Sequence, residues 1–177
     1  MLIKKSADVG RAVTNLLEEE GMTNGQMAFD LNVSTQLVSH YKHDRRPMQQ
    51  DVGKQAIQIY NDNPEFVGDL LHEFSGGYTS PVFRGKAIER HRLAVEANAE
   101  REIKEALQKI EEVCLAKPPA VTTAEEKESI ESMMDELVEA RAFIDNLIMM
   151  LEKEYNISIM QRIKRLIPKW KSKGWLA

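Results

Sequence analysis

Hydrogen-bonding side chains gather on one face of the helix that the spacing predicts for residues 34–43. At 100° per residue, five of them fall within an arc of about 140°: Thr35, Gln36, Ser39, His40 and His43. The opposite side carries Leu37, Val38 and Tyr41, which would anchor the helix. Amide, hydroxyl and imidazole groups on a fixed rod suit the edges of nucleobases, and a glutamine can bind adenine through two hydrogen bonds. The pattern predicts base contacts, with an ordinary solvated helix face as the alternative.

Positive charge follows this face directly. Lys42, Arg45 and Arg46 stand at the end of the predicted helix, where they would contact phosphate groups and set the orientation of a duplex. The whole chain is acidic, with a formal net charge of −4. Because a small footprint on DNA needs only a local positive patch, this net charge does not exclude a nucleic-acid partner.

The segment 22–47 reads MTNGQMAFDLNVSTQLVSHYKHDRRP and resembles the helix-turn-helix of the Cro/C1 repressor-type (XRE) regulators. Ala28 stands where the family has a small residue between two crossing helices. Leu31 and Val33 stand where the family wedges the turn, and Ser34 where it caps the recognition helix. The run Arg45-Arg46-Pro47-Met48 is similar to the basic exit and helix stop of the same family.

The resemblance covers about residues 6–74 and implies a five-helix, lambda-repressor-like domain that binds double-stranded DNA. It also implies phosphate contacts from Asn24 and Ser34, in addition to those of the cations. The chain departs from the family pattern where Asn24 replaces a frequent Gln, and where Asn32 and Asp44 replace a frequent Gly. Asn tolerates the left-handed backbone that such a turn needs. Asp44 would repel phosphate if its side chain faced the DNA.

Helical spacing without sustained strand alternation predicts an all-α chain. Five short helices are expected in the first part: residues 6–20, 24–31, 34–43, 49–61 and 64–74. Ser6 is the expected N-cap of the first helix and Gly21 its stop. A Gly- and Pro-containing breaker cluster occupies residues 76–81. The predicted domains are therefore a helix-turn-helix domain over 1–78 and a helical oligomerisation or interaction domain over 79–177.

Two long helices are predicted after this boundary, at about 82–115 and from Thr122 or Thr123 onward. Thr123 and Glu126 match a capping box. The second helix carries an apolar a/d stripe typical of a helical hairpin or a coiled coil, with the predicted oligomerisation residues Ile130, Met134, Leu137, Ile144, Leu147 and Leu151. Because a two-helix hairpin alone buries little surface, a homodimer or higher homo-oligomer is the preferred interpretation. A bundle within one chain is the alternative.

The last segment, 161–177, is basic and its role stays open. Its six cations are accompanied by no acidic residue, and an apolar stripe runs beside them. Pro168 is expected to end the helix that carries this stripe. The alternatives are a terminal helix docked on the long helices, a sequence-independent contact to DNA phosphate, or an amphipathic element for a membrane surface or another protein.

Other classes of function are not expected. No catalytic motif or phosphate-binding loop appears in the sequence, so neither an enzyme nor a cofactor is predicted. His40 and His43 lie one turn apart, but two ligands make a weak site, and no metal is expected. No apolar run reaches the length of a membrane span, residues 1–5 do not start a secretory signal, and Cys114 is the lone cysteine. These features fit a cytoplasmic protein.

The sequence thus predicts a sequence-specific DNA-binding transcriptional regulator of bacterial or phage type, which reads the major groove with residues 34–43 as a dimer. Repression is the sign of regulation that the family resemblance implies. Two other functions stay open. A replication or partition protein would use the same module on repeated origin sites, whereas a protein-interaction module would carry a vestigial helix-turn-helix and bind no DNA.

Overall fold

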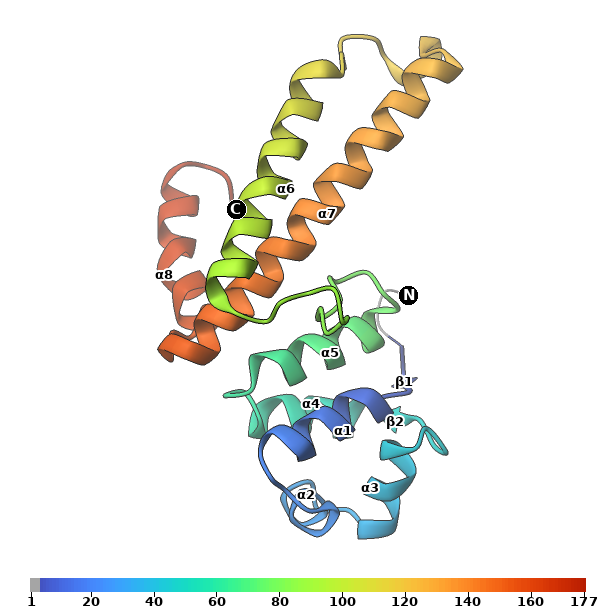
Figure 1. Ribbon diagram of the computed structural model, residues 1–177, viewed down its shortest axis with the longest axis vertical. Helices are drawn as coiled ribbons and strands as arrows, with labels where there is room; N and C mark the ends of the chain where they lie inside the picture. The colour runs from blue at the N-terminus through green and yellow to red at the C-terminus, as the bar shows by residue number, and fades with distance from the viewer. Residues whose placement is uncertain (1–3) are drawn as a thin grey trace.

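The computed structural model describes residues 4–177 and is built mainly of α-helices, as predicted (Figure 1). Residues 1–3, part of the segment expected to lack a secretory signal, lie outside the described residues. None of the helices between residues 4 and 177 has the length and apolar character needed to cross a lipid bilayer. The elements in chain order are β1 (Ser6–Ala7), α1 (Gly10–Glu19), α2 (Asn24–Asp30), α3 (Thr35–Lys42), β2 (Met48–Gln49), α4 (Gln50–Ile59), α5 (Pro64–Ser75), α6 (Arg92–Glu112), a 3-10 turn (Pro119–Val121), α7 (Ala124–Tyr155) and α8 (Ile159–Ser172).

The described chain begins with a short strand where the sequence predicts a helix. β1 pairs antiparallel with β2, so that Ser6 lies opposite Gln49 and Ala7 opposite Met48. Helix α1 starts at Gly10 rather than at residue 6, and the prediction of Ser6 as its N-cap is wrong. Ala7 and Met48 are both buried, so the pairing closes the core between the chain start and the segment after α3. Local spacing could not reveal a strand whose partner is remote in the sequence.

The N-terminus of α1 is capped by a residue far along the chain. Its own N-cap residue, Val9, offers no side-chain hydrogen bond. The Gly10 N–H donates instead to Oδ1 of Asp44 at 2.7 Å. A carboxylate at the positive end of a helix is favourable, so Asp44 stabilises the domain. Asp44 is itself exposed, and its backbone is left-handed with a φ of 51°.

Replacing Asp44 should therefore destabilise the domain in a graded way. Asp44→Ala removes the cap and strains the left-handed backbone, and we expect the free energy of unfolding to fall by about 1–3 kcal/mol. Asp44→Asn keeps an acceptor oxygen and tolerates that backbone, so its loss should be less than half as large. Urea unfolding followed by circular dichroism measures both. Equal losses for the two variants would contradict the capping role.

One buried cluster organises the first part of the chain. Its members lie between Ala7 and Phe74 and come from β1, β2 and helices α1 to α5. Tyr60 packs on Phe66 in an edge-to-face geometry with the ring centroids 5.7 Å apart. Helix α3 packs on both α1 and α2. The cluster therefore provides the rigid base on which α2 and α3 are held.

Helices α6 and α7 run side by side away from this cluster and form a hairpin (Figure 1). The capping box at the start of α7 is confirmed, because Thr123 Oγ1 accepts from the Glu126 N–H and a Glu126 carboxylate oxygen accepts from the Thr123 N–H. The predicted helix over 82–115 is wrong at its start, since α6 begins only at Arg92. Apart from Val95 and Met133, the buried apolar residues between the two helices are alanines: Ala99, Ala106 and Ala140.

Buried ion pairs explain part of the non-helical path of residues 82–91. The side chain of Arg84, only 9% exposed, lies 3.1 Å from Glu65 and 2.8 Å from Asp69, both on α5. Arg90 places a second cation on Glu65 at 2.5 Å. These contacts hold the segment against α5, and a helix over the same residues would have to break them.

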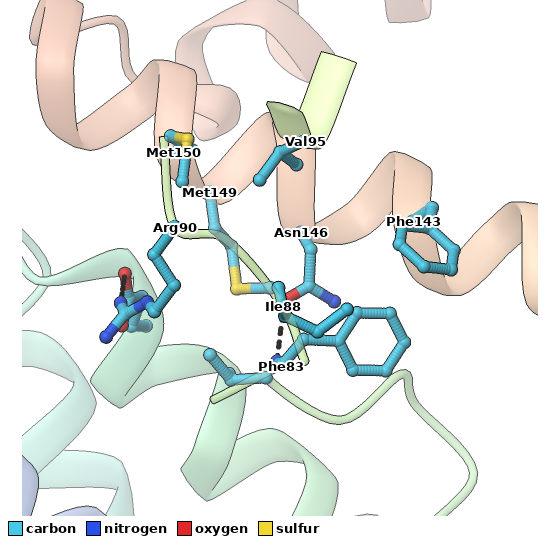
Figure 2. A pocket seen from close by; sticks show the side chains of 10 residues that line it. Phe83, Ile88, Arg90, Val95, Phe143, Asn146, Met149 and Met150 are labelled. Atoms are coloured by element: carbon cyan, nitrogen blue, oxygen red, sulfur yellow. Dashed lines mark hydrogen bonds and ion pairs between the residues drawn. The ribbon is translucent and has the colours of Figure 1, made fainter. Parts of the chain in front are cut away.

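Apolar and backbone contacts hold the same segment against α7 (Figure 2). The Phe83 N–H donates to Oδ1 of Asn146 at 2.8 Å. The ring of Phe83 meets that of Phe143 at a centroid distance of 4.9 Å. The cavity beside them measures about 20 Å³, which is room for about one water molecule. This junction therefore joins the hairpin to the first part of the chain by packing.

Helix α8 continues through Pro168 to Ser172, so the prediction that Pro168 ends it is wrong. Proline in a helix interior removes the hydrogen bond to the carbonyl four residues earlier. Here that carbonyl belongs to Lys164, and both residues are exposed. Water can replace the lost hydrogen bond, and the ring displaces no packed neighbour.

Candidate nucleic-acid interface

The segment that the sequence predicts as a helix-turn-helix folds into two short helices joined by a tight turn. Thr23 and Gln26 form a reciprocal capping box at the start of α2. The turn passes through Asn32, whose φ of 50° is left-handed, as expected for an asparagine at this position. Ser34 caps α3 by accepting from the Leu37 N–H at 3.1 Å, which confirms its predicted role. The two caps set where each helix begins.

Helix α3 is held along one side only. Val38 and Tyr41 are 0% and 2% exposed, and Leu37 is partly buried against the same cluster. Burial raises the pKa of the Tyr41 hydroxyl, and the Asp51 carboxylate adds to this shift against the opposing charge of Arg46. Tyr41 therefore stays neutral over the physiological pH range, and α3 has a stable apolar anchor.

The other side of α3 faces solvent. Thr35, Gln36 and His43 are exposed, whereas Ser39 and His40 are half-buried. Nδ1 of His43 lies 2.8 Å from the carbonyl oxygen of Ser39. Since a carbonyl can only accept, Nδ1 carries the proton and Nε2 is left as the free acceptor of a neutral ring. The predicted base-contacting residues thus lie together, with three of them fully open to a ligand.

Cations and polar caps surround this surface. Arg45 and Arg46 are exposed and Lys42 is half-buried. Within residues 4–177, none of these three takes part in an ion pair. Ser34 is exposed, and its hydroxyl can still donate while its oxygen caps α3. Asn24, the first residue of α2, is half-buried. Uncompensated charge at the end of α3 is available for an anionic partner.

Two carboxylates near α2 and α3 are hydrogen-bonded to other parts of the domain. Asp44 accepts from the α1 N-terminus, as described above. Asp30 accepts from the Tyr60 hydroxyl at 2.8 Å, and burial together with this hydrogen bond raises the pKa of Tyr60. Each of these two carboxylates thus has a hydrogen-bond donor of its own within the domain.

The rear half of the chain leaves this surface open. In Figure 1, α2 and α3 lie at one end of the molecule, and the α6–α7 hairpin extends from the opposite side of α5. Helix α5, not α3, packs against α7. A long ligand can approach α3 without displacing the hairpin.

The predicted oligomerisation residues divide into two groups on α7. Ile144 and Leu147 are half-buried, and Leu147 lies beside Arg92 and Leu93 of α6. Met134, Leu137 and Leu151 are exposed, and Ile130 is half-buried. Part of the predicted stripe thus packs within the hairpin, and part remains open.

An acidic cluster that sequence reasoning did not single out lies between α6 and α7. Glu102, Glu136 and Glu139 bring carboxylate oxygens within 4.8 Å of one another. Glu102 is buried and accepts from the Arg101 guanidinium at 2.6 Å. That guanidinium partly balances the charge of the cluster.

Comparison with known proteins gives no relative: no protein-family model, no curated protein and no solved structure matches this chain. Its function must be inferred from the residues and their geometry.

Proposed function

We propose that this chain binds double-stranded DNA at specific sequences and regulates transcription, as its resemblance to the Cro/C1-type regulators implies. The observation that supports this most is the two-sided character of α3. One side is buried through Val38 and Tyr41, and the other presents hydrogen-bonding groups next to Arg45 and Arg46. Neither arginine forms an ion pair with a carboxylate in the described chain.

In this proposal α2, the turn and α3 act as a helix-turn-helix. Eight helical residues span about 12 Å, a length that a major groove about 12 Å wide accommodates. Gln36 and its exposed neighbours would read base edges. Arg45 and Arg46 would contact phosphates and fix the orientation of α3. The Ser34 hydroxyl, at the positive end of α3, would approach the backbone at the other end of the helix.

We further propose that the hairpin makes the protein a homodimer. Apolar side chains directly follow buried interface residues on both helices: Ile103 and Leu107 on α6, and Met134 on α7. Each of these residues is one position after a buried residue, which turns its side chain by about 100° around the helix axis. Because the two helices are antiparallel, this turn brings the apolar residues of both helices to the same side of the hairpin. Large apolar residues thus lie outside a pair of helices whose own interface includes three alanines, Ala99, Ala106 and Ala140. A second copy would cover them and complete a four-helix bundle.

Charged substitutions on this face should convert the dimer to a monomer. Met134→Lys with Val138→Lys should do so because these side chains are 58% and 59% exposed and contribute little to the fold of one chain. Multi-angle light scattering gives the mass. The matched control is Ala97→Lys with Gln108→Lys, two exposed positions elsewhere on α6, which should leave the mass unchanged. A wild-type mass near 20.2 kDa would refute the dimer.

Selection of duplexes from a random pool tests the proposed function. We expect enrichment of a pseudo-palindromic site with half-sites about 10 base pairs apart, or a multiple of that. Binding should weaken as salt rises, because condensed counterions are released. Absence of both enrichment and salt-dependent binding would overturn the proposal. Enrichment of direct repeats, with a footprint over an array rather than a promoter, would assign the chain to replication or partition instead.

A further inference from the structure

Helix α8 divides into an apolar side and a basic side. At 100° per residue, six apolar side chains fall within an arc of about 120°: Ile159, Met160, Ile163, Leu166, Ile167 and Trp170. Cations border this arc on both edges, with Arg162 and Lys169 on one and Lys164 and Lys171 on the other. Residues 161–177 contain six cations and no acidic side chain. The helix is therefore amphipathic along its whole length and strongly positive.

The apolar side of α8 is only partly covered by the rest of the described chain. Ile159, Ile167 and Trp170 are half-buried, so the chain covers this side only in part. None of its residues is fully buried, and Met160, Ile163 and Leu166 are 60%, 43% and 38% exposed. The positive charge is also uncompensated, because no ion pair within residues 4–177 involves a cation of α8. Helix α7 nevertheless carries ten acidic residues against three basic ones. The cations of α8 thus form no ion pairs with α7, the acidic helix that precedes α8 in the sequence.

The position of α8 separates it from the proposed DNA interface. In Figure 1, α8 is drawn on the hairpin side of α5, whereas α3 lies on the opposite side of α5. The cations of α8 are therefore not part of the surface that α3 presents. This placement disfavours a second contact to the same DNA site.

We propose that α8 binds the surface of an anionic lipid bilayer. An amphipathic helix with tryptophan on its apolar side and lysine or arginine along both edges lies flat in the interfacial layer, with its apolar face buried and its cations on acidic headgroups. Trp170 lies within the apolar arc of α8, and Trp175 follows two residues after Lys173 with 66% of its surface exposed. Tryptophan is enriched at membrane–water interfaces.

The charge of the rest of the chain favours contact with an anionic bilayer through the C-terminal segment. The α6–α7 hairpin and the first part of the chain are both acidic overall. The C-terminal segment 161–177 is instead purely basic and combines its cations with an apolar side, which the cations at the end of α3 do not. Because α8 and α3 lie on opposite sides of α5 in Figure 1, a membrane-bound molecule keeps α3 free. This inference goes beyond the proposed function and does not depend on it, since no DNA contact enters the argument from α8.

Tryptophan fluorescence tests the proposal without a label, because both tryptophans of the chain, Trp170 and Trp175, lie in this segment. Full-length protein is mixed with vesicles that contain phosphatidylglycerol, or with vesicles of phosphatidylcholine alone, and binding is confirmed by flotation. We expect a blue shift and co-flotation with the anionic vesicles only. Raised salt should release the protein, because headgroup attraction is screened.

Two variants separate the apolar from the electrostatic contribution. Leu166→Glu should lower vesicle binding at least about tenfold, because it places a charge in the apolar arc. Lys169→Gln with Lys171→Gln should lower it about 10- to 30-fold by removing two headgroup contacts. The controls are Val121→Glu, an exposed apolar position outside α8, and Lys104→Gln with Lys127→Gln on the hairpin. Both controls should bind as wild type does.

Several outcomes would overturn the inference. A blue shift of the tryptophan fluorescence that depends on protein concentration in the absence of lipid, with no further shift when vesicles are added, would show that a second copy covers α8. A shift on adding random duplex, with none on adding anionic vesicles, would assign the cations to DNA phosphate. Equal binding to neutral and anionic vesicles would show that charge has no role. An equal loss of vesicle binding in the variants and in the controls would show that α8 has no role.

Discussion

Replacing Gln36 by alanine is expected to weaken binding to the selected operator by about 1–3 kcal/mol, a factor of about 5 to 150. Gln36 is exposed and contributes no contact to the buried cluster, so the free energy of unfolding should stay nearly unchanged. The loss should also be specific. Binding to scrambled duplex should hardly change, because an amide that reads a base edge adds little to phosphate contacts. Fluorescence anisotropy on both duplexes measures the difference.

Arg46 provides the contrasting result. Arg46→Gln should weaken binding to operator and scrambled duplex by similar factors, and it should lower the slope of log K against log salt by about one unit. Gln108→Ala, an exposed glutamine on the hairpin, should alter neither affinity nor slope. Equal loss of affinity for operator and scrambled DNA in Gln36→Ala would contradict its base-reading role.

The largest loss of stability is expected from Arg84→Met. Arg84 is the cation shared by Glu65 and Asp69, whose side chains are only 7% and 15% exposed. Glu65 keeps its contact with Arg90 in this variant, but Asp69 loses its cation. Removing one partner of a buried ion pair leaves uncompensated charge in a poorly solvated site, at a cost of about 3–5 kcal/mol. Urea unfolding at neutral pH should show this loss. Lys104→Met, which breaks the exposed pair with Glu100, should cost less than about 1 kcal/mol.

The deficit of Arg84→Met should also depend on pH. Burial raises the pKa of Asp69 above its ordinary value of 3.8, although Arg84 opposes this shift. Without Arg84 the pKa of Asp69 rises further. A raised folded-state pKa means that the folded protein binds the proton more tightly, so the difference from wild type is largest above this pKa and shrinks as pH falls toward 3.8. A difference that stays constant with pH would show that lost packing, not unpaired charge, causes the deficit.

Local sequence patterns predicted the features that depend on residues close together in the sequence. The Ser34 cap, the Thr123 capping box and the left-handed Asn32 each depend on residues within a few positions, and the structure shows all three. The same holds for the apolar side of α3, because helical spacing decides which side chains share a face. These are the features that form the candidate interface.

Features that depend on remote partners were not predictable from spacing. Helix α1 begins late because β1 pairs with β2 and because Asp44 supplies its cap. Residues 82–91 carry no helix breaker except glycine, yet the pairs of Arg84 with α5 hold them in another path. At Pro168 the local rule was itself wrong, because it predicted that the proline ends the helix. Exposure to water removes most of the free-energy cost of the hydrogen bond that the proline cannot make. Tertiary contacts decided each of these cases.

Scanning the selected operator with 7-deazapurines tests the central claim most directly. This substitution deletes only N7, an acceptor that faces the major groove, and leaves base pairing and the backbone intact. We expect wild type to lose affinity at one or two purines in each half-site. At one of these, Gln36→Ala should show no further loss, which is the coupling that a direct contact produces. Tolerance of 7-deazapurines throughout the site, or strictly additive losses with Gln36→Ala at all purines, would contradict major-groove reading by α3.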